Sequence, residues 1–170
     1  MSLPVALGIV ETNSVDYIQT LFQALRDETV VVPLRSSGDT QRINLANVGE
    51  IAEPEAQGGW CEEKLSLADG DSIAHVSFTS GTEGTPKGVF ISRSALNDVV
   101  TRLQGLMNMD QTTREYIGVP VYHSFGYGRC RHVASVGGQF YIPSSGFDPR
   151  EVSVMLASKA INALLSLIHI

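Results

Sequence analysis

The stretch FTSGTEGTPKGV, residues 78–89, combines three glycines, one lysine and several hydroxyl side chains in a short segment. Gly81, Gly84 and Gly88 let backbone N–H groups approach anionic oxygens with no side chain in the way. Lys87 adds a mobile positive charge. The hydroxyl donors of the stretch are Thr79, Ser80, Thr82 and Thr85. This composition predicts a flexible clamp over a polyphosphate.

Two common phosphate loops do not fit the stretch. The Walker pattern G-x-x-x-x-G-K-[ST], started from Gly81, requires a glycine where Pro86 stands and a hydroxyl residue where Gly88 stands. The dinucleotide pattern G-x-G-x-x-G fails because Gly81 is followed by its next glycine three positions later, at Gly84. An ordinary Gly/Ser/Thr turn between two strands remains the plain structural alternative.

The segment at the N-terminus of the chain predicts a βαβ unit. PVALGIV, residues 4–10, is a short apolar run typical of a buried strand. Asn13 or Ser14 is expected to cap a helix, and ETVVVPLR, residues 28–35, is expected to form the next parallel strand. The apolar stripe of the helix is Ile18, Leu21, Phe22 and Leu25.

Residues 36–71 carry a weaker pattern, rich in Gly, Pro, Glu and Asp, and are interpreted as a connecting region without chemistry. Within it, RINLANV (42–48) and EKLSL (63–67) are the candidate short strands. Trp60 is expected to be a packed loop aromatic.

The glycine-rich stretch is predicted to lie between strands IAHVSF (73–78) and GVFIS (88–92). A helix capped by Ser92 or Ser94 follows, and its expected core stripe is Leu96, Val99, Val100, Leu103 and Met107.

Two further strands are predicted at YIGVPVYHS (116–124) and GQFYIP (138–143). The last helix is expected in FDPREVSVML (147–156), with Asp148 as N-cap, Pro149 at the first position and Glu151 completing a capping box. Its expected core stripe is Val152, Met155 and Leu156. Strands and helices alternate almost throughout, so the predicted class is α/β.

Composition excludes several classes of function. The chain has 170 residues, the size of one ordinary domain, and a net charge of -6 that argues against a nucleic-acid surface. Cys61 and Cys130 lack the spacing of a zinc site, and no metal ligands are assigned. No run has the length of a membrane span and the start does not resemble a signal peptide, so the sequence predicts a cytoplasmic location.

FTSGTEGTPKGV resembles the phosphate-loop signature of the adenylate-forming (AMP-dependent synthetase/ligase) superfamily, which includes acyl-CoA ligases and peptide-synthetase adenylation domains. At the position of Glu83 that family most often has threonine. A second stretch, GVPVYHSFGYG, is similar to the P-x-x-H segment of the acyl-CoA ligase branch, with Pro120 and His123 on its motif positions. The resemblance runs with a gap from about residue 5 to residue 164 and implies part of an N-terminal domain, a largely parallel sheet layered with helices.

The resemblance implies a two-step reaction with ATP, Mg²⁺ and coenzyme A. A carboxylic acid, expected to be a fatty or aryl acid, attacks the α-phosphate of ATP, and a thiol then displaces AMP. The implied acyl-pocket residue is His123. The implied phosphate-binding residues are Thr79, Ser80, Gly81, Thr82, Glu83, Gly84 and Lys87.

Two alternatives stay open. The thiol acceptor is either coenzyme A or a carrier protein, as in an acyl-carrier-protein ligase or a peptide-synthetase adenylation domain. A function of another class is a nucleotide-binding module without chemistry.

The resemblance also implies a division of the chain. Residues 1–164 are interpreted as an incomplete AMP-binding domain, because the family's adenylation lysine and later motifs have no counterpart in this sequence. Residues 165–170, LSLIHI, match one reading frame of a transposon-end adapter and are interpreted as a non-native tail. The chain by itself is therefore expected to be inactive in adenylation.

Overall fold

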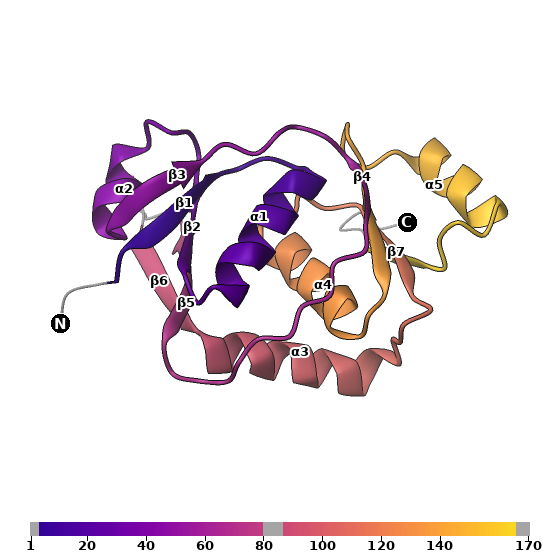
Figure 1. Cartoon of the computed structure of the whole chain (residues 1–170). Helices are drawn as coiled ribbons and strands as arrows, with labels where there is room; N and C mark the ends of the chain where they lie inside the picture. Colours follow the sequence, from indigo (N-terminus) through magenta and orange to yellow (C-terminus); the bar gives the residue numbers. More distant parts are fainter. Residues whose placement is uncertain (1–3, 80–86, 166–170) are drawn as a thin grey trace.

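Two β-sheets with helices between and outside them form the architecture (Figure 1). The computed structural model describes residues 4–79 and 87–165. Sheet A has the order β3-β1-β2-β5-β6, and sheet B has the order β4-β8-β7-β9. Most neighbouring strands are parallel, but β5–β6 and β4–β8 are antiparallel. The predicted α/β class with a largely parallel sheet is confirmed.

The elements follow one another in this order: β1 Ala6–Val10, α1 Val15–Arg26, β2 Val30–Leu34, α2 Thr40–Leu45, β3 Val48–Ala52, β4 Gly59–Cys61, β5 Ile73–Thr79, β6 Lys87–Ser92, α3 Arg93–Met107, β7 Arg114–Ile117, α4 Ser124–Ser135, β8 Gln139–Ile142, α5 Pro149–Ala157 and β9 Ala163–Leu165. None of the helices in the described ranges is long and apolar enough to span a membrane.

The first βαβ unit forms as its sequence predicts. β1 and β2 are parallel neighbours, and Ser14 caps α1 by accepting a hydrogen bond from the backbone N–H of Tyr17. The predicted stripe Ile18, Leu21, Phe22 and Leu25 is fully buried. An apolar face repeating at helical spacing is driven into the core because burying it removes apolar surface from water.

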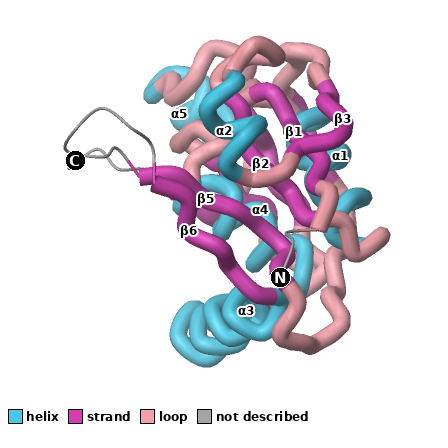
Figure 2. Tube along the Cα trace, turned by 90° about the vertical axis from the view of Figure 1, so that its left-hand side faces the viewer, coloured by secondary structure: helices cyan, strands magenta, loops and turns pink. Residues whose placement is uncertain are grey.

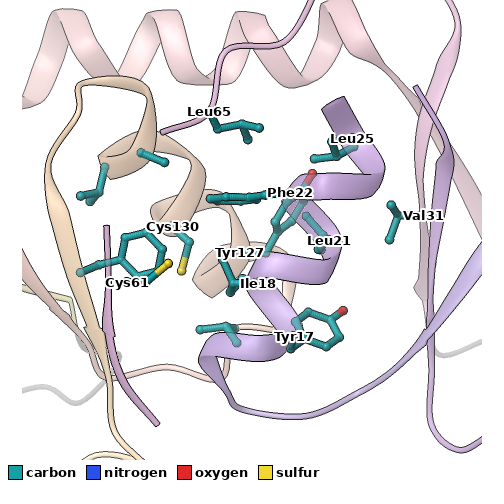
Figure 3. Close-up of a cluster of buried hydrophobic side chains, with 14 of the residues drawn as sticks. Tyr17, Ile18, Leu21, Phe22, Leu25, Val31, Cys61, Leu65, Tyr127 and Cys130 are labelled. Carbon is teal, nitrogen blue, oxygen red and sulfur yellow. The ribbon is translucent and has the colours of Figure 1, made fainter. Parts of the chain in front are cut away.

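Helices α1 and α4 lie between the two sheets and supply most of the central core (Figure 1). Side chains from both helices meet there, among them Phe22 of α1 and Cys130 of α4 (Figure 3). Sheet A contributes residues such as Val31, and sheet B contributes Cys61 and Phe140. Helices α2 and α5 cover the outer faces, so the layers alternate helix, sheet, helix, sheet, helix.

The connecting region differs from the prediction at three places. RINL of the expected strand RINLANV lies in α2, because the Asp39 side chain accepts a hydrogen bond from the backbone N–H of Arg42 and starts a helical turn. The strand β3 begins only at Val48. EKLSL forms no strand, and Trp60 lies in β4 rather than in a loop, packed edge-on against Tyr141 at 5.5 Å between ring centroids.

Helix α4 was not predicted, since YIGVPVYHS was interpreted as one strand. Only residues 114–117 form the strand β7, and the chain turns before α4 begins at Ser124. The buried face of α4 mixes apolar Tyr127, Cys130 and Val133 with charged or polar Arg129, Arg131 and His132. Gly126 and Gly128 also lower its helix propensity. The apolar periodicity of this helix is therefore weak.

The last helix, α5, begins as predicted, with Asp148 as N-cap and Pro149 at its first position. The predicted capping box is wrong, because the carboxylate of Glu151 accepts hydrogen bonds from the hydroxyls of Tyr116 and Tyr141 instead. Val152 is buried as expected, but Leu156 is exposed.

Gly126 allows α4 to approach the turn that precedes it. A Cβ atom at this position would lie 2.3 Å from the carbonyl oxygen of Pro120, a backbone atom that cannot rotate away. We expect Gly126→Ala to lower the free energy of unfolding by about 1–3 kcal/mol, as overpacking does.

Gly128 is the matched control in the same helix, since a Cβ there meets no atom within 4 Å. Gly128→Ala is expected to stabilise the protein by roughly 0.5–1 kcal/mol through helix propensity. Urea unfolding, followed by the fluorescence of the single tryptophan Trp60, measures both changes. Effects of the same sign in the two variants would contradict the packing described here.

Candidate functional site

The glycine-rich stretch joins two antiparallel strands of sheet A, β5 and β6 (Figure 2). Thr79 ends β5, Lys87 begins β6, and the two residues are partners in the strand register. Both side chains are exposed. The two flanking strands predicted from the sequence are confirmed. The predicted phosphate-binding residues Ser80, Gly81, Thr82, Glu83 and Gly84 lie outside the described residues.

His123 occupies the N-cap position of α4, and its side chain is exposed. The turn before the helix is fixed by Asn13, whose side-chain oxygen accepts a hydrogen bond from the backbone N–H of Val121 at 3.0 Å. The amide nitrogen of Asn13 donates to the carbonyl oxygen of Pro143 at 3.1 Å, which ties the turn to sheet B as well. Asn13 was considered in the sequence only as a helix cap, and Ser14 takes that role.

His123 and residues of sheet A line a cavity of about 300 Å³. It opens at the carboxyl ends of the parallel strands β1, β2 and β5, where α/β proteins commonly bind ligands. Glu11 follows β1 and Arg35 follows β2, whereas Ser77 and Phe78 belong to β5. The remaining lining residues are Pro33, Arg42, His75, Tyr122 and Ser124.

Arg42 holds a buried positive charge on one wall of this cavity. Its Nη1 donates to the Glu11 carboxylate and to the carbonyl oxygen of Pro33 at 2.9 Å, and its guanidinium lies 4.8 Å from the centre of the Phe78 ring. Arg42 forms ion pairs with both Glu11 and Asp39, and exposed Arg35 adds a further cation at the rim. The charged side chains that line the cavity are therefore Arg35, Arg42 and Glu11.

His75 is a buried polar residue in the floor of the cavity. Its ring stacks on Tyr127 at 5.0 Å, and its Nδ1 shares a hydrogen bond of 3.2 Å with the hydroxyl of Ser77. Burial, helped by the charge of Arg131, lowers the pKa of His75 to about 3. The ring is consequently neutral at pH 7 and orients Ser77 without adding charge.

An apolar groove of about 370 Å³ adjoins this polar cavity and shares Ser77 and Ser124 with it. Its walls come from α3, which contributes Val99 and Met107, and from α4, which contributes Phe125. All three side chains are more than a third exposed. The stripe on α3 was expected to enter the core, but only Leu96 of that stripe is buried. Val99, Leu103 and Met107 line the groove, whereas Val100 lines a separate cavity.

The described residues contain no group of three or more His, Cys, Asp or Glu side chains that could hold a metal ion. The chemistry that these residues offer is hydrogen bonding and positive charge beside an apolar groove.

The chain is 27% identical over 99 residues to the medium-chain-fatty-acid–CoA ligase of Ectopseudomonas oleovorans, a match that covers 57% of this chain and 18% of the relative. It is also 27% identical over 114 residues to the pyochelin synthetase PchF of Pseudomonas aeruginosa, covering 62% of this chain and 6% of the relative. The chain thus spans a small part of the curated relatives that it matches.

Solved structures share the fold. The o-succinylbenzoate CoA synthetase of Bacillus subtilis, in complex with its acyl-adenylate intermediate, superposes with a TM-score of 0.72 at 15% identity, over 96% of this chain and 49% of that protein. The same enzyme with ATP and magnesium gives a TM-score of 0.69 at 14% identity, over 96% and 50%. These superpositions show a common fold.

The fold is that of the N-terminal portion of adenylate-forming acyl-CoA synthetases. The profile of the AMP-binding enzyme family matches residues 6–164, and the chain belongs to that family.

Proposed function

We propose that this chain is part of an ATP-dependent ligase that activates a fatty or aryl carboxylic acid as an acyl-adenylate and passes the acyl group to coenzyme A. The observation that carries the proposal is the adjacency of three features. These are the ends of the glycine-rich stretch, the polar cavity with His123, and the apolar groove that shares Ser77 and Ser124 with that cavity.

The phosphate end of the site is assigned to Thr79, Ser80, Gly81, Thr82, Glu83, Gly84 and Lys87. Support comes from the register of β5 and β6, which places Thr79 and Lys87 opposite each other at the base of the stretch. When the carboxylate oxygen bonds to the α-phosphorus of ATP, the bond to pyrophosphate breaks and charge moves onto the leaving group. Hydroxyl donors and the ammonium group of Lys87 stabilise that charge electrostatically.

The nucleotide substrate is assigned as ATP with magnesium. A structure of the B. subtilis relative that contains both supports this assignment. In this chain, no step is assigned to the metal.

The acyl end of the site is assigned to His123 and the adjoining groove. The carboxylate of the acid lies near Ser77 and Ser124, where the polar cavity and the groove meet, and its apolar tail occupies the groove between α3 and α4. Burying a methylene group contributes about 0.8 kcal/mol, so the groove favours acids with several apolar carbons over acetate. The match to a medium-chain-fatty-acid–CoA ligase supports the same class of acid.

A carrier protein is the second candidate acceptor, favoured by the match to a pyochelin synthetase. In the deciding experiment, the natural protein that contains this chain is mixed with ATP and one of a series of acids from acetate to dodecanoate. AMP release is then measured with coenzyme A and with a phosphopantetheinylated carrier protein as acceptor. The proposal predicts release with coenzyme A, rising by roughly fourfold per added methylene until the groove is filled. Release only with a phosphopantetheinylated carrier would reassign the acceptor, and no dependence on any acid would overturn the ligase proposal.

A further inference from the structure

Asn13 lies in the short connection between β1 and α1, and its side chain joins this connection to two distant segments. Its Oδ1 accepts a hydrogen bond from the backbone N–H of Val121, and its Nδ2 donates to the carbonyl oxygen of Pro143. Val121 belongs to the turn before α4, and Pro143 directly follows β8. The connection is itself fixed, because β1 is paired on both sides and Ser14 caps α1. Asn13 therefore holds the turn from a rigid part of the fold.

The bond to Val121 serves a backbone group that has no access to water. Val121 has 0% of its surface exposed, so its N–H would carry the full cost of desolvation without a partner. Within the turn, the N–H of His123 donates to the carbonyl oxygen of Pro120 at 3.2 Å. Gly126 of α4 packs against the same carbonyl group. The turn is thus fixed by its own backbone, by α4 and by Asn13.

The position of His123 depends on this turn. Its ring caps no backbone N–H of α4 and makes no hydrogen bond within residues 4–79 and 87–165, and it lies 4.7 Å from the ring of Tyr122 next to it in the chain. The backbone of the turn consequently decides where the ring enters the polar cavity. Ser124 follows directly and lines both the polar cavity and the apolar groove. A shift of the turn would move both residues.

We propose that Asn13 is a positioning residue for the acyl end of the site. By holding the N–H of Val121, it places His123 and Ser124 where the polar cavity meets the apolar groove. The inference rests on the proposed function, which assigns the carboxylate of the acid to that junction. An asparagine suits this role because one short planar amide carries both the acceptor and the donor that the two bonds need.

Two substitutions in the natural protein separate the two bonds of Asn13. Asn13→Ala removes both, whereas Asn13→Asp keeps an oxygen that accepts from Val121 and loses the donor to Pro143. In Asn13→Ala, we expect the Val121 amide to exchange its hydrogen at least about tenfold faster and the NMR signals of the His123 ring to shift. In Asn13→Asp, we expect the Val121 amide to stay protected. These measurements need no enzymatic activity.

The control is Asn162, which forms the same pair of bonds far from the site. Its side-chain oxygen accepts from the N–H of Arg114 at 2.8 Å, and its nitrogen donates to the carbonyl oxygen of Thr112 at 2.9 Å. It lines neither the polar cavity nor the apolar groove. Asn162→Ala is therefore expected to leave Val121 exchange and the His123 signals unchanged.

Pyrophosphate exchange into ATP then measures the effect on the acid substrate. Asn13→Ala is expected to lower kcat/KM for octanoate about 10–100-fold, because a displaced turn misplaces the groups around the carboxylate. KM for ATP is expected to stay within about twofold, since the glycine-rich stretch belongs to sheet A. Asn13→Asp is expected to restore most of the octanoate value, and Asn162→Ala to match the unmodified protein.

Several results would overturn the positioning role of Asn13. One is an unchanged kcat/KM for octanoate in Asn13→Ala although the Val121 amide has lost protection. Another is an equal loss in Asn162→Ala. If Asn13→Ala does not fold, Asn13→Asp decides, because a large loss with Val121 still protected contradicts the role. If even the unmodified protein shows no exchange, the ligase proposal fails, and unshifted His123 signals in Asn13→Ala would separately refute the role of Asn13.

Discussion

Glu115→Ala is expected to lower the stability of the fold strongly. The residue lies on β7 with 1% of its surface exposed, and its carboxylate is the counter-charge of Arg129, which is 4% exposed. Removing it leaves the guanidinium buried and unpaired, which costs about 3–5 kcal/mol. Since domains are stable by roughly 5–15 kcal/mol in total, we expect a strongly lowered urea midpoint.

A double variant tests whether the cause is the orphaned charge rather than lost packing. Glu115→Leu combined with Arg129→Met replaces the ion pair by apolar side chains, next to Met107 and Met109, which already contact Arg129. It is expected to be more stable than Glu115→Ala, because no buried charge is left over. A surface control is Asp98→Ala, whose exposed pair with Arg102 contributes about 0.3–0.5 kcal/mol. If the double variant were as unstable as Glu115→Ala, the loss of stability could not be assigned to the unpaired charge of Arg129.

Lys87→Gln is expected to slow the first half-reaction about 10²–10³-fold, if this chain belongs to a ligase as proposed. The substitution keeps a polar side chain at the start of β6 but removes the positive charge proposed to stabilise the leaving pyrophosphate. Pyrophosphate exchange into ATP measures this step in the natural protein. Because Lys87 is exposed, the unfolding free energy is expected to change by no more than about 0.5 kcal/mol.

The matched control for Lys87→Gln is Arg102→Gln, another exposed cation distant from the glycine-rich stretch in sequence. Its exchange rate is expected to equal that of the unmodified protein. An equal loss of rate in both variants would point to a general charge effect and away from the assigned role of Lys87.

A helix whose buried face is uniformly apolar could be predicted from the sequence, and a helix whose buried face mixes apolar and charged residues could not. The stripe from Ile18 to Leu25 identified α1 because those side chains enter the core. Helix α4 escaped prediction because charged residues interrupt the apolar residues of its buried face. Arg129 pairs with Glu115 of β7 and Arg131 donates to the carbonyl oxygen of Leu96 in α3, partners that the sequence does not reveal. The stripe on α3 was assigned correctly to a helix but wrongly to the core.

In the candidate site too, some residues could be predicted from the sequence and others could not. The stretch that contains Lys87 and the segment with His123 are continuous motifs. The residue types of the first pointed to phosphate, and the resemblance of the second to a family segment implied acyl chemistry. Glu11, Arg42 and His75 come from separate segments and meet only in the folded chain. One signal was available, because Glu11 directly follows a predicted parallel strand and such ends commonly face ligands.

The most direct test of the account is whether the natural protein that contains this chain exchanges labelled pyrophosphate into ATP only when a carboxylic acid is present. The account predicts exchange that saturates with a medium-chain or aryl acid and disappears without it. Binding of ATP with no exchange in the presence of any fatty or aryl acid would contradict the proposed ligase and favour a nucleotide-binding module without chemistry.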